Sequence, residues 1–328
     1  MRLLRVVVVW NYVMVAGAAV CVAGQFVFMK TYQTKVGSTS VLNFAFSAAA
    51  AVLSCLLFLC VGAFDIHVSA FTVYMALGMS FACTLNSVLG IFAVSYGKLS
   101  VFTMSMMLGG MLLPFLYGLL FLNEPVTAWR IVGCILLVAA LVYTSLAGNP
   151  EGKKNRLVFY GLCALVFVSN GAVSIISKCH QIGAQASGTI DYCVMTYAFM
   201  FGFSALALAV CLLLRRRKRS APALLQGGAA EAAPVPAGEG AEDVPAANKK
   251  RLLGLLSVAA YAVISGAGYL LQLYGAVDLP ASVLYPIVTG GSIVLTAVFG
   301  RVFFKERITW KMWIGFAVAL LATVLFLF

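Results

Sequence analysis

Apolar runs of 18 residues or more recur along this 328-residue chain, and they constrain its fold more than any other feature. As a helix, each run is long enough to cross the roughly 30 Å of hydrocarbon in a bilayer. Only 10% of the residues are charged, against about 25% in soluble proteins. The sequence therefore predicts an all-α integral membrane protein with ten transmembrane helices, at about residues 6–28, 41–62, 70–94, 100–122, 127–147, 157–178, 192–214, 252–276, 280–303 and 309–328.

The chain also contains an internal repeat. Five residues recur 182 positions later, so that Gly118, Phe121, Glu124, Thr127 and Gly133 match Gly300, Phe303, Glu306, Thr309 and Gly315. An earlier match, Lys30 with Lys178, has an offset of 148, and the offset grows where residues 215–251 are inserted. The repeat divides the chain into halves 1–149 and 150–328, each with five predicted spans. Because five is odd, we expect two inverted repeats related by a pseudo-two-fold axis in the membrane plane.

The basic residues predict how the chain is oriented. Of its 22 Lys and Arg residues, 18 follow the first, third, fifth, seventh and ninth spans, and the other four are Arg2, Arg5, Arg130 and Lys178. Cytoplasmic loops carry the excess of basic residues. The sequence therefore predicts a multi-pass protein of the plasma (inner) membrane, with residues 215–251 in the cytoplasm and both termini outside.

Residues 215–251 form a long basic loop with an Ala/Pro/Gly/Glu-rich centre, a composition typical of disorder. The net charge of +12 lies largely in this and the other loops, where it serves topology and contact with lipid headgroups. We therefore expect the lipid bilayer, and no nucleic acid, as a partner. The sequence leaves the oligomeric state open.

The two copies of the repeated hinge carry a family resemblance. They read Leu122-Asn123-Glu124-Pro125-Val126-Thr127 and Phe304-Lys305-Glu306-Arg307-Ile308-Thr309. With five spans in each half, they resemble the two EamA-type domains of the drug/metabolite transporter superfamily. The resemblance implies alternating access and a central cavity, lined mainly by spans one, three, four, six, eight and nine, with spans five and ten at the periphery. Many relatives have cytoplasmic termini, but for this chain we follow its own charge distribution.

Two interpretations exist for the hinge residues Glu124, Thr127, Glu306 and Thr309. Each glutamate lies at the end of a span, just before a helix that begins near the threonine. Threonine is a good N-cap, and a carboxylate is favourable near the positive end of a helix. We therefore expect a structural role at the hinge, with binding of substrate or protons as the alternative.

Polar residues within the spans indicate where a solute could bind, because such residues usually face the protein interior or a water-filled cavity. They form stripes at helical spacing, notably Tyr261, Ser265, Gly268 and Gln272, then Tyr285, Thr289, Ser292 and Thr296. The predicted substrate-binding residues are Gln25, Asn86, Asn170, Tyr269, Gln272, Tyr285 and Thr289. The alternative is that such residues hold helices together, as we expect of the glycine pairs 109–110 and 290–291.

Lys30 and Lys178 occupy matched positions near the ends of the first and sixth spans. The favoured interpretation is that both side chains extend to the lipid headgroups. Attraction of an anionic group of the substrate is the alternative.

The ten acidic residues all lie in loops or at span ends. A cation in the membrane would need an acidic partner, so the sequence favours a neutral or zwitterionic small-molecule substrate. The chain also lacks the acidic, histidine and phosphate-binding motifs of membrane enzymes and ATP-driven pumps, and its nine cysteines form no Cys-x-x-Cys pair. We therefore predict a secondary transporter without enzymatic activity, cofactor or metal. A membrane assembly or lipid-handling protein is the alternative function.

Overall fold

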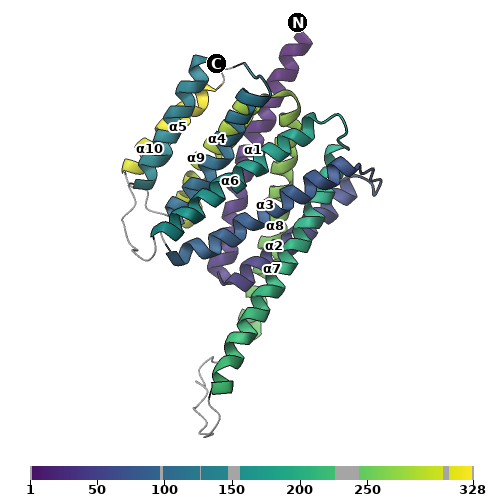
Figure 1. Ribbon diagram of the computed structural model, residues 1–328, viewed down its shortest axis with the longest axis vertical. Helices are drawn as coiled ribbons and strands as arrows, with labels where there is room; N and C mark the ends of the chain where they lie inside the picture. The colour runs from purple at the N-terminus through teal and green to yellow at the C-terminus, as the bar shows by residue number, and fades with distance from the viewer. Residues whose placement is uncertain are drawn as a thin grey trace.

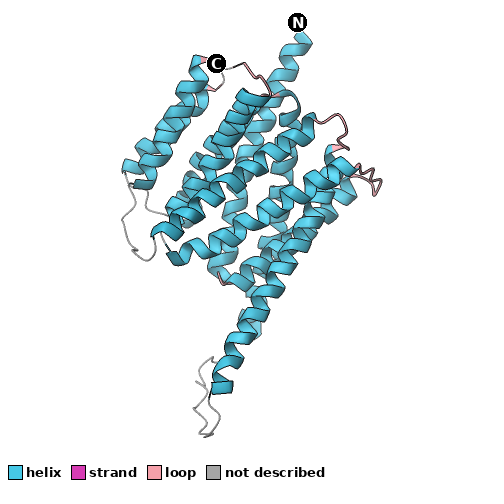
Figure 2. Ribbon diagram, viewed as in Figure 1, coloured by secondary structure: helices cyan, strands magenta, loops and turns pink. Residues whose placement is uncertain are grey.

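The computed structural model describes residues 2–96, 99–125, 127–146, 156–225, 244–305 and 310–326. These residues form ten helices and no strand (Figures 1 and 2). The helices are α1 (Arg2–Lys35), α2 (Ser40–Val61), α3 (Ala70–Tyr96), α4 (Leu99–Phe121), α5 (Ala128–Leu146), α6 (Arg156–Ile182), α7 (Thr189–Leu225), α8 (Val244–Asp278), α9 (Ala281–Phe304) and α10 (Trp310–Leu325).

Seven of the described helices, α1, α2, α3, α6, α7, α8 and α9, contain a segment long and apolar enough to cross a membrane. Shorter apolar segments lie in the other three, at Ser105–Phe121, Ala128–Ala140 and Trp313–Leu325. The chain is therefore an all-α, multi-pass integral membrane protein. Each helix overlaps one of the ten segments predicted from the sequence.

The segment 215–251 differs from the disordered loop predicted by its composition. α7 continues to Leu225 and α8 already begins at Val244, so both ends of this segment are helical. Arginine, lysine, alanine and leucine, which dominate these ends, are all good helix formers. Composition alone therefore overestimated the length of the loop. Only the centre of the segment lies outside the described residues.

The helix contacts follow a regular scheme. α1 packs along α8 and α9, just as α6 packs along α3 and α4, and α3–α7 has its equivalent in α2–α8. The pairs α2–α7, α4–α9 and α5–α10 complete the scheme, with α5 and α10 side by side at one edge (Figure 1). Exchanging each helix with the one five places away thus leaves most contacts unchanged, although α6–α8, α7–α8 and α5–α9 depart from this rule.

The two ends of the bundle are distinguished by the helices that meet at each of them. At the α8–α9 end, Leu279 and Pro280 join α8 to α9, and both chain termini lie at this end (Figure 1). At the opposite α7–α8 end, α7 finishes and α8 starts. α7 projects beyond the other helices there (Figure 1).

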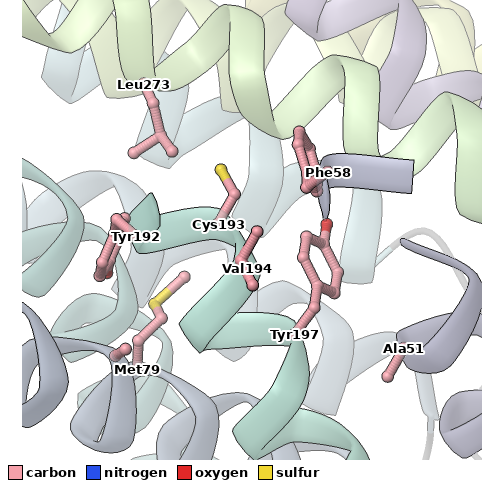
Figure 3. Packing of buried hydrophobic residues seen from close by; sticks show 9 residues of the cluster. Ala51, Phe58, Met79, Tyr192, Cys193, Val194, Tyr197 and Leu273 are labelled. Carbon is pink, nitrogen blue, oxygen red and sulfur yellow. The ribbon is translucent and has the colours of Figure 1, made fainter. Parts of the chain in front are cut away.

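Aromatic and glycine contacts fix the helix spacing. Tyr192 and Tyr197 of α7 pack among α2, α3 and α8 (Figure 3), and Tyr197 stacks on Phe58 of α2 with ring centroids 5.6 Å apart. A β-carbon at Gly109 would collide with the backbone of Phe167, so α4 and α6 pack closely at this point. Close helix packing was predicted for this glycine pair. A β-carbon at Gly290 would likewise collide with Thr323 of α10.

Candidate functional site

A cavity of about 390 Å³ lies in the middle of the bundle. Its described lining comes from α1, α2, α3, α4, α6, α7, α8 and α9, and α5 and α10 contribute no described residue to it. The cavity is therefore enclosed by eight of the ten described helices.

All seven residues predicted to bind substrate line this one cavity, namely Gln25, Asn86, Asn170, Tyr269, Gln272, Tyr285 and Thr289. Asn170 links two helices, because its Nδ2 donates to the Met106 carbonyl oxygen of α4 at 2.8 Å and its Oδ1 accepts from Asn86 Nδ2 at 3.2 Å. The Tyr285 hydroxyl donates to the Ser174 carbonyl oxygen. The residues thus combine packing contacts with exposure to the cavity.

The polar stripes turn toward the cavity only in part. Tyr261, Ser265 and Ser292 line it. Gly268 instead packs against α1, where an added β-carbon would lie 2.7 Å from Cys21 Cβ. The hydroxyl of Ser177 lies 3.3 Å from that of Tyr269, beside the cavity.

The sequence reasoning missed the contribution of α2 and α7. Ser47 and Ser54 of α2 line the cavity, as do Thr196 and Ser204 of α7. The two serines of α2 are seven residues apart, a spacing that puts them on one helix face. This weak signal could have indicated the lining of α2.

The described lining contains no aspartate, glutamate, lysine, arginine or histidine. It combines hydroxyl and amide groups with tyrosine and methionine side chains. Thr84 Oγ1, Asn86 Oδ1 and Thr196 Oγ1 are buried without a hydrogen-bond partner in the protein. Buried polar atoms normally have partners, and these three belong to residues that line the cavity.

The hinge residue Glu124 has a different partner from the one predicted. Its carboxylate accepts hydrogen bonds from the backbone N–H groups of Ala281, at 2.7 Å, and Ser282, at 2.9 Å. It therefore caps α9 of the other half, rather than the helix that follows it. Tertiary folding brings the end of α4 to the start of α9, which sequence distance cannot reveal.

Thr127 caps the helix that follows the hinge. The backbone N–H of Arg130 donates to Thr127 Oγ1 at 3.4 Å, at the start of α5. The second copy of the hinge, with Glu306 and Thr309, lies outside the described residues.

Lys178 does not extend to the headgroups, contrary to the sequence-based interpretation. Its residue is only 4% exposed, and its Nζ donates to the carbonyl oxygens of Ala276, at 2.6 Å, and Leu279, at 2.8 Å. These carbonyls lie at the C-terminal end of α8, where a helix leaves its last carbonyls without partners and favours a cation. The matched Lys30 places its Nζ 4.7 Å from the centroid of the Phe304 ring.

The cavity is closed toward the α8–α9 end. Between it and this end, Val15 and Ala18 of α1 pack with Ala276 of α8 and Leu284 of α9, and all four are buried. Residues 281–286 of α9 are buried, whereas 293–299, on the side of the α7–α8 end, are half-buried. A second hollow, between α1 and α9, lies on that more open side.

Comparison with known proteins identifies the family. The EamA-like transporter family matches residues 159–328, which is more than half of the chain. This chain belongs to the EamA-like transporter family. The comparison with curated proteins gave no match. Among similar solved structures, a crystal structure of a protein is 13% identical in sequence, has a TM-score of 0.67, and aligns over 96% of this chain and 95% of that chain. At this identity the likeness shows the fold alone.

The structure agrees in part with what the resemblance to EamA-type domains implied. The six helices expected around a central cavity, α1, α3, α4, α6, α8 and α9, all line it. α5 and α10 pair at the edge, as implied. In this EamA-like transporter, α2 and α7 also contribute to the lining.

Proposed function

We propose that this protein is a secondary transporter that moves a small neutral or zwitterionic metabolite, such as an amino-acid-like solute, by alternating access. The central cavity with its uncharged, polar lining carries the proposal. Its volume of about 390 Å³ falls in the range of about 300–1,000 Å³ that is usual for small-molecule sites.

The lining favours a solute without net charge. A charged group in a membrane interior needs a charged or strongly polar partner, and the described lining offers no charged side chain. It does offer Gln25, Asn86 and Gln272, whose amides can both donate and accept hydrogen bonds. Tyr261 and Tyr269 add flat apolar surface for the remainder of the solute.

Two inverted five-helix halves, with all ten helices crossing the bilayer, would supply the movement. The exchange symmetry of the helix contacts supports this arrangement. So do Asn123 and Lys305, which precede the repeated glutamates and both have a left-handed backbone, with φ of 49° and 53°. In transporters of this kind, one part rocks against the other around a fixed site.

The charge distribution supports an orientation with the α7–α8 end in the cytoplasm. Lys178 was counted among the four basic residues of the other side, but it is buried among helices. The excess of basic residues on the α7–α8 side therefore becomes 18 against three on the other side. In this orientation the packed layer at the α8–α9 end faces outside, and the hollow between α1 and α9 lies on the cytoplasmic side.

A flux screen tests the proposal. The purified protein is reconstituted in liposomes, and counterflow is measured for a library of labelled metabolites. We expect counterflow of at least one net-neutral polar solute. Absence of flux for every solute, with protein that is folded and inserted, would contradict the proposal.

Thr196→Val provides the matched variant for this screen. Thr196 is a lining residue, and its buried Oγ1 makes no hydrogen bond within the protein, so the substitution should leave folding intact, and under the proposal it removes a hydroxyl that binds the solute. Loss of one hydrogen bond, about 0.5–1.5 kcal/mol, should raise KM by about 2-fold to 13-fold. The control is Ser257→Ala, because Ser257 Oγ bonds to Leu253 of its own helix and is not among the lining residues.

A further inference from the structure

Three side chains converge on the turn between α8 and α9. Lys178 of α6 binds the carbonyl oxygens of Ala276 and Leu279. Glu124, from the segment after α4, binds the first N–H groups of α9. Asn11 of α1 donates from Nδ2 to Asp278 Oδ2 at 3.0 Å. The turn is therefore held from α6, from α1 and from the segment that follows α4.

The charges of Lys178 and Glu124 match the helix ends that they contact. The C-terminal end of α8 presents carbonyl oxygens and receives an ammonium group, and the N-terminal end of α9 presents N–H groups and receives a carboxylate. Each contact satisfies backbone groups that the helix itself leaves free. Because Lys178 is only 4% exposed, its charge would be uncompensated if the turn moved away without water entering.

These contacts lie one helical turn beyond the cavity. Four residues separate Lys178 from the lining residue Ser174, and four separate Ala276 from Gln272. Four residues also separate Tyr285 from Ala281, which Glu124 caps. Four residues of helix rise about 6 Å, so the contacts form the layer between the cavity and the α8–α9 end.

We propose that Lys178 and Glu124 form a latch that keeps the cavity closed at the α8–α9 end and opens during the transport cycle. Opening would move the α8–α9 turn away from α6 and α4, and water would then solvate the ammonium, the carboxylate and the freed helix ends. Other titratable groups near the latch are Asp278 on α8, Cys179 on α6 and Tyr117 on α4.

The latch rests on the proposed function, since it presumes a cavity that opens alternately to the two sides. Its test needs no transported solute, however, so the two proposals can fail separately. Lys30 supplies a matched control, because it corresponds to Lys178 in the repeat but contacts Phe304 at the other end of α9.

The experiment measures thiol labelling of a cavity residue from each side of the membrane. Thr289→Cys is placed in a background without the nine native cysteines. A membrane-impermeant maleimide is added to right-side-out or inside-out vesicles. With the latch intact, we expect labelling from the α7–α8 end only. Lys178→Ala should accelerate labelling from the α8–α9 end by about tenfold or more, since it removes a buried charged contact, and Lys30→Ala should not.

If Lys178→Ala does not fold, Glu124→Gln is measured in its place. It preserves the shape of the side chain but removes the charge, and it should also accelerate labelling from the α8–α9 end. Unchanged labelling rates from that end in folded variants would overturn the latch. Equal acceleration by Lys30→Ala would overturn it as well, because the effect would then be unrelated to the α8–α9 turn.

Chemical rescue gives a second readout. Methylammonium can occupy the place of the lysine ammonium and donate to the carbonyls of Ala276 and Leu279, whereas tetramethylammonium cannot donate. In Lys178→Ala, methylammonium alone should slow labelling from the α8–α9 end. Slowing by both cations, or by neither, would contradict the role of these carbonyls in closing the cavity.

Discussion

At the scale of single residues, Gly118 and Glu124, which both recur in the repeat, are linked by a steric requirement. The Glu124 carboxylate folds back over the end of α4, so close to Gly118 that an added β-carbon would lie 2.5 Å from Glu124 Oε2. The absence of a side chain at Gly118 thus permits Glu124 to reach α9. For the first copy of the hinge, the pair Gly118 and Glu124 is thus explained by a cap rather than by chemistry on a substrate.

Gly118→Ala should therefore destabilise the protein. The new methyl group would displace the carboxylate and free two buried N–H groups, at a cost of about 1–3 kcal/mol. We expect a melting temperature lower by several degrees in detergent or nanodiscs. Gly202→Ala is the control, because an added β-carbon there meets nothing within 4 Å. Equal melting temperatures for the two variants would contradict this role of Gly118.

At the scale of helices, the repeated hinge ends α4 and α9 in the same way. Asn123 and Lys305 follow these helices in matched positions and share a left-handed backbone. The Lys305 N–H donates to the Gly300 carbonyl oxygen at the end of α9. Asparagine tolerates this conformation better than lysine does, so the second copy of the hinge is the more strained one.

Replacing Lys305 by glycine should relieve this strain. We expect Lys305→Gly to stabilise the protein by about 0.5–1 kcal/mol, and Asn123→Gly to give a smaller gain. Arg301→Gly, inside α9 at the same end, should instead lose about 1 kcal/mol through poorer helix propensity. Thermal unfolding of the three variants measures this order, and a loss of stability in Lys305→Gly would refute the proposed strain.

The sequence predicted the helices and part of the cavity lining, because both depend on local patterns. Apolar length marked each helix, and polar residues at helical spacing marked the faces of α8 and α9 that meet the cavity. It did not predict that Glu124 caps α9 or that Lys178 is buried, because both depend on which helix ends meet in space. The cavity-facing hydroxyls of α2 and α7 escaped because isolated serine and threonine residues also occur as helix contacts.

At the scale of the whole molecule, the proposed orientation follows from charge. The α7–α8 end carries the basic residues Arg215–Arg219 of α7 and Lys249–Arg251 of α8, and a cytoplasmic position suits them. A reporter active only outside the cytoplasm, fused after Phe328, should therefore give a signal. The same reporter inserted between residues 225 and 244 should be silent. The reverse result would invert the topology and place the closed end of the cavity in the cytoplasm.

The central claim is that the cavity is the solute site of a transporter, and labelling with solute protection tests it most directly. Gln272→Cys and Tyr285→Cys are made separately in a background without native cysteines, because both residues line the cavity. Ser257→Cys, outside the lining, is the control. We predict that an impermeant thiol reagent labels both cavity positions, and that the solute found in the flux screen slows this labelling without affecting Ser257→Cys. Cavity positions that stay unlabelled from both sides in folded protein, or labelling that the solute leaves unchanged, would contradict the claim and favour a membrane assembly or lipid-handling protein.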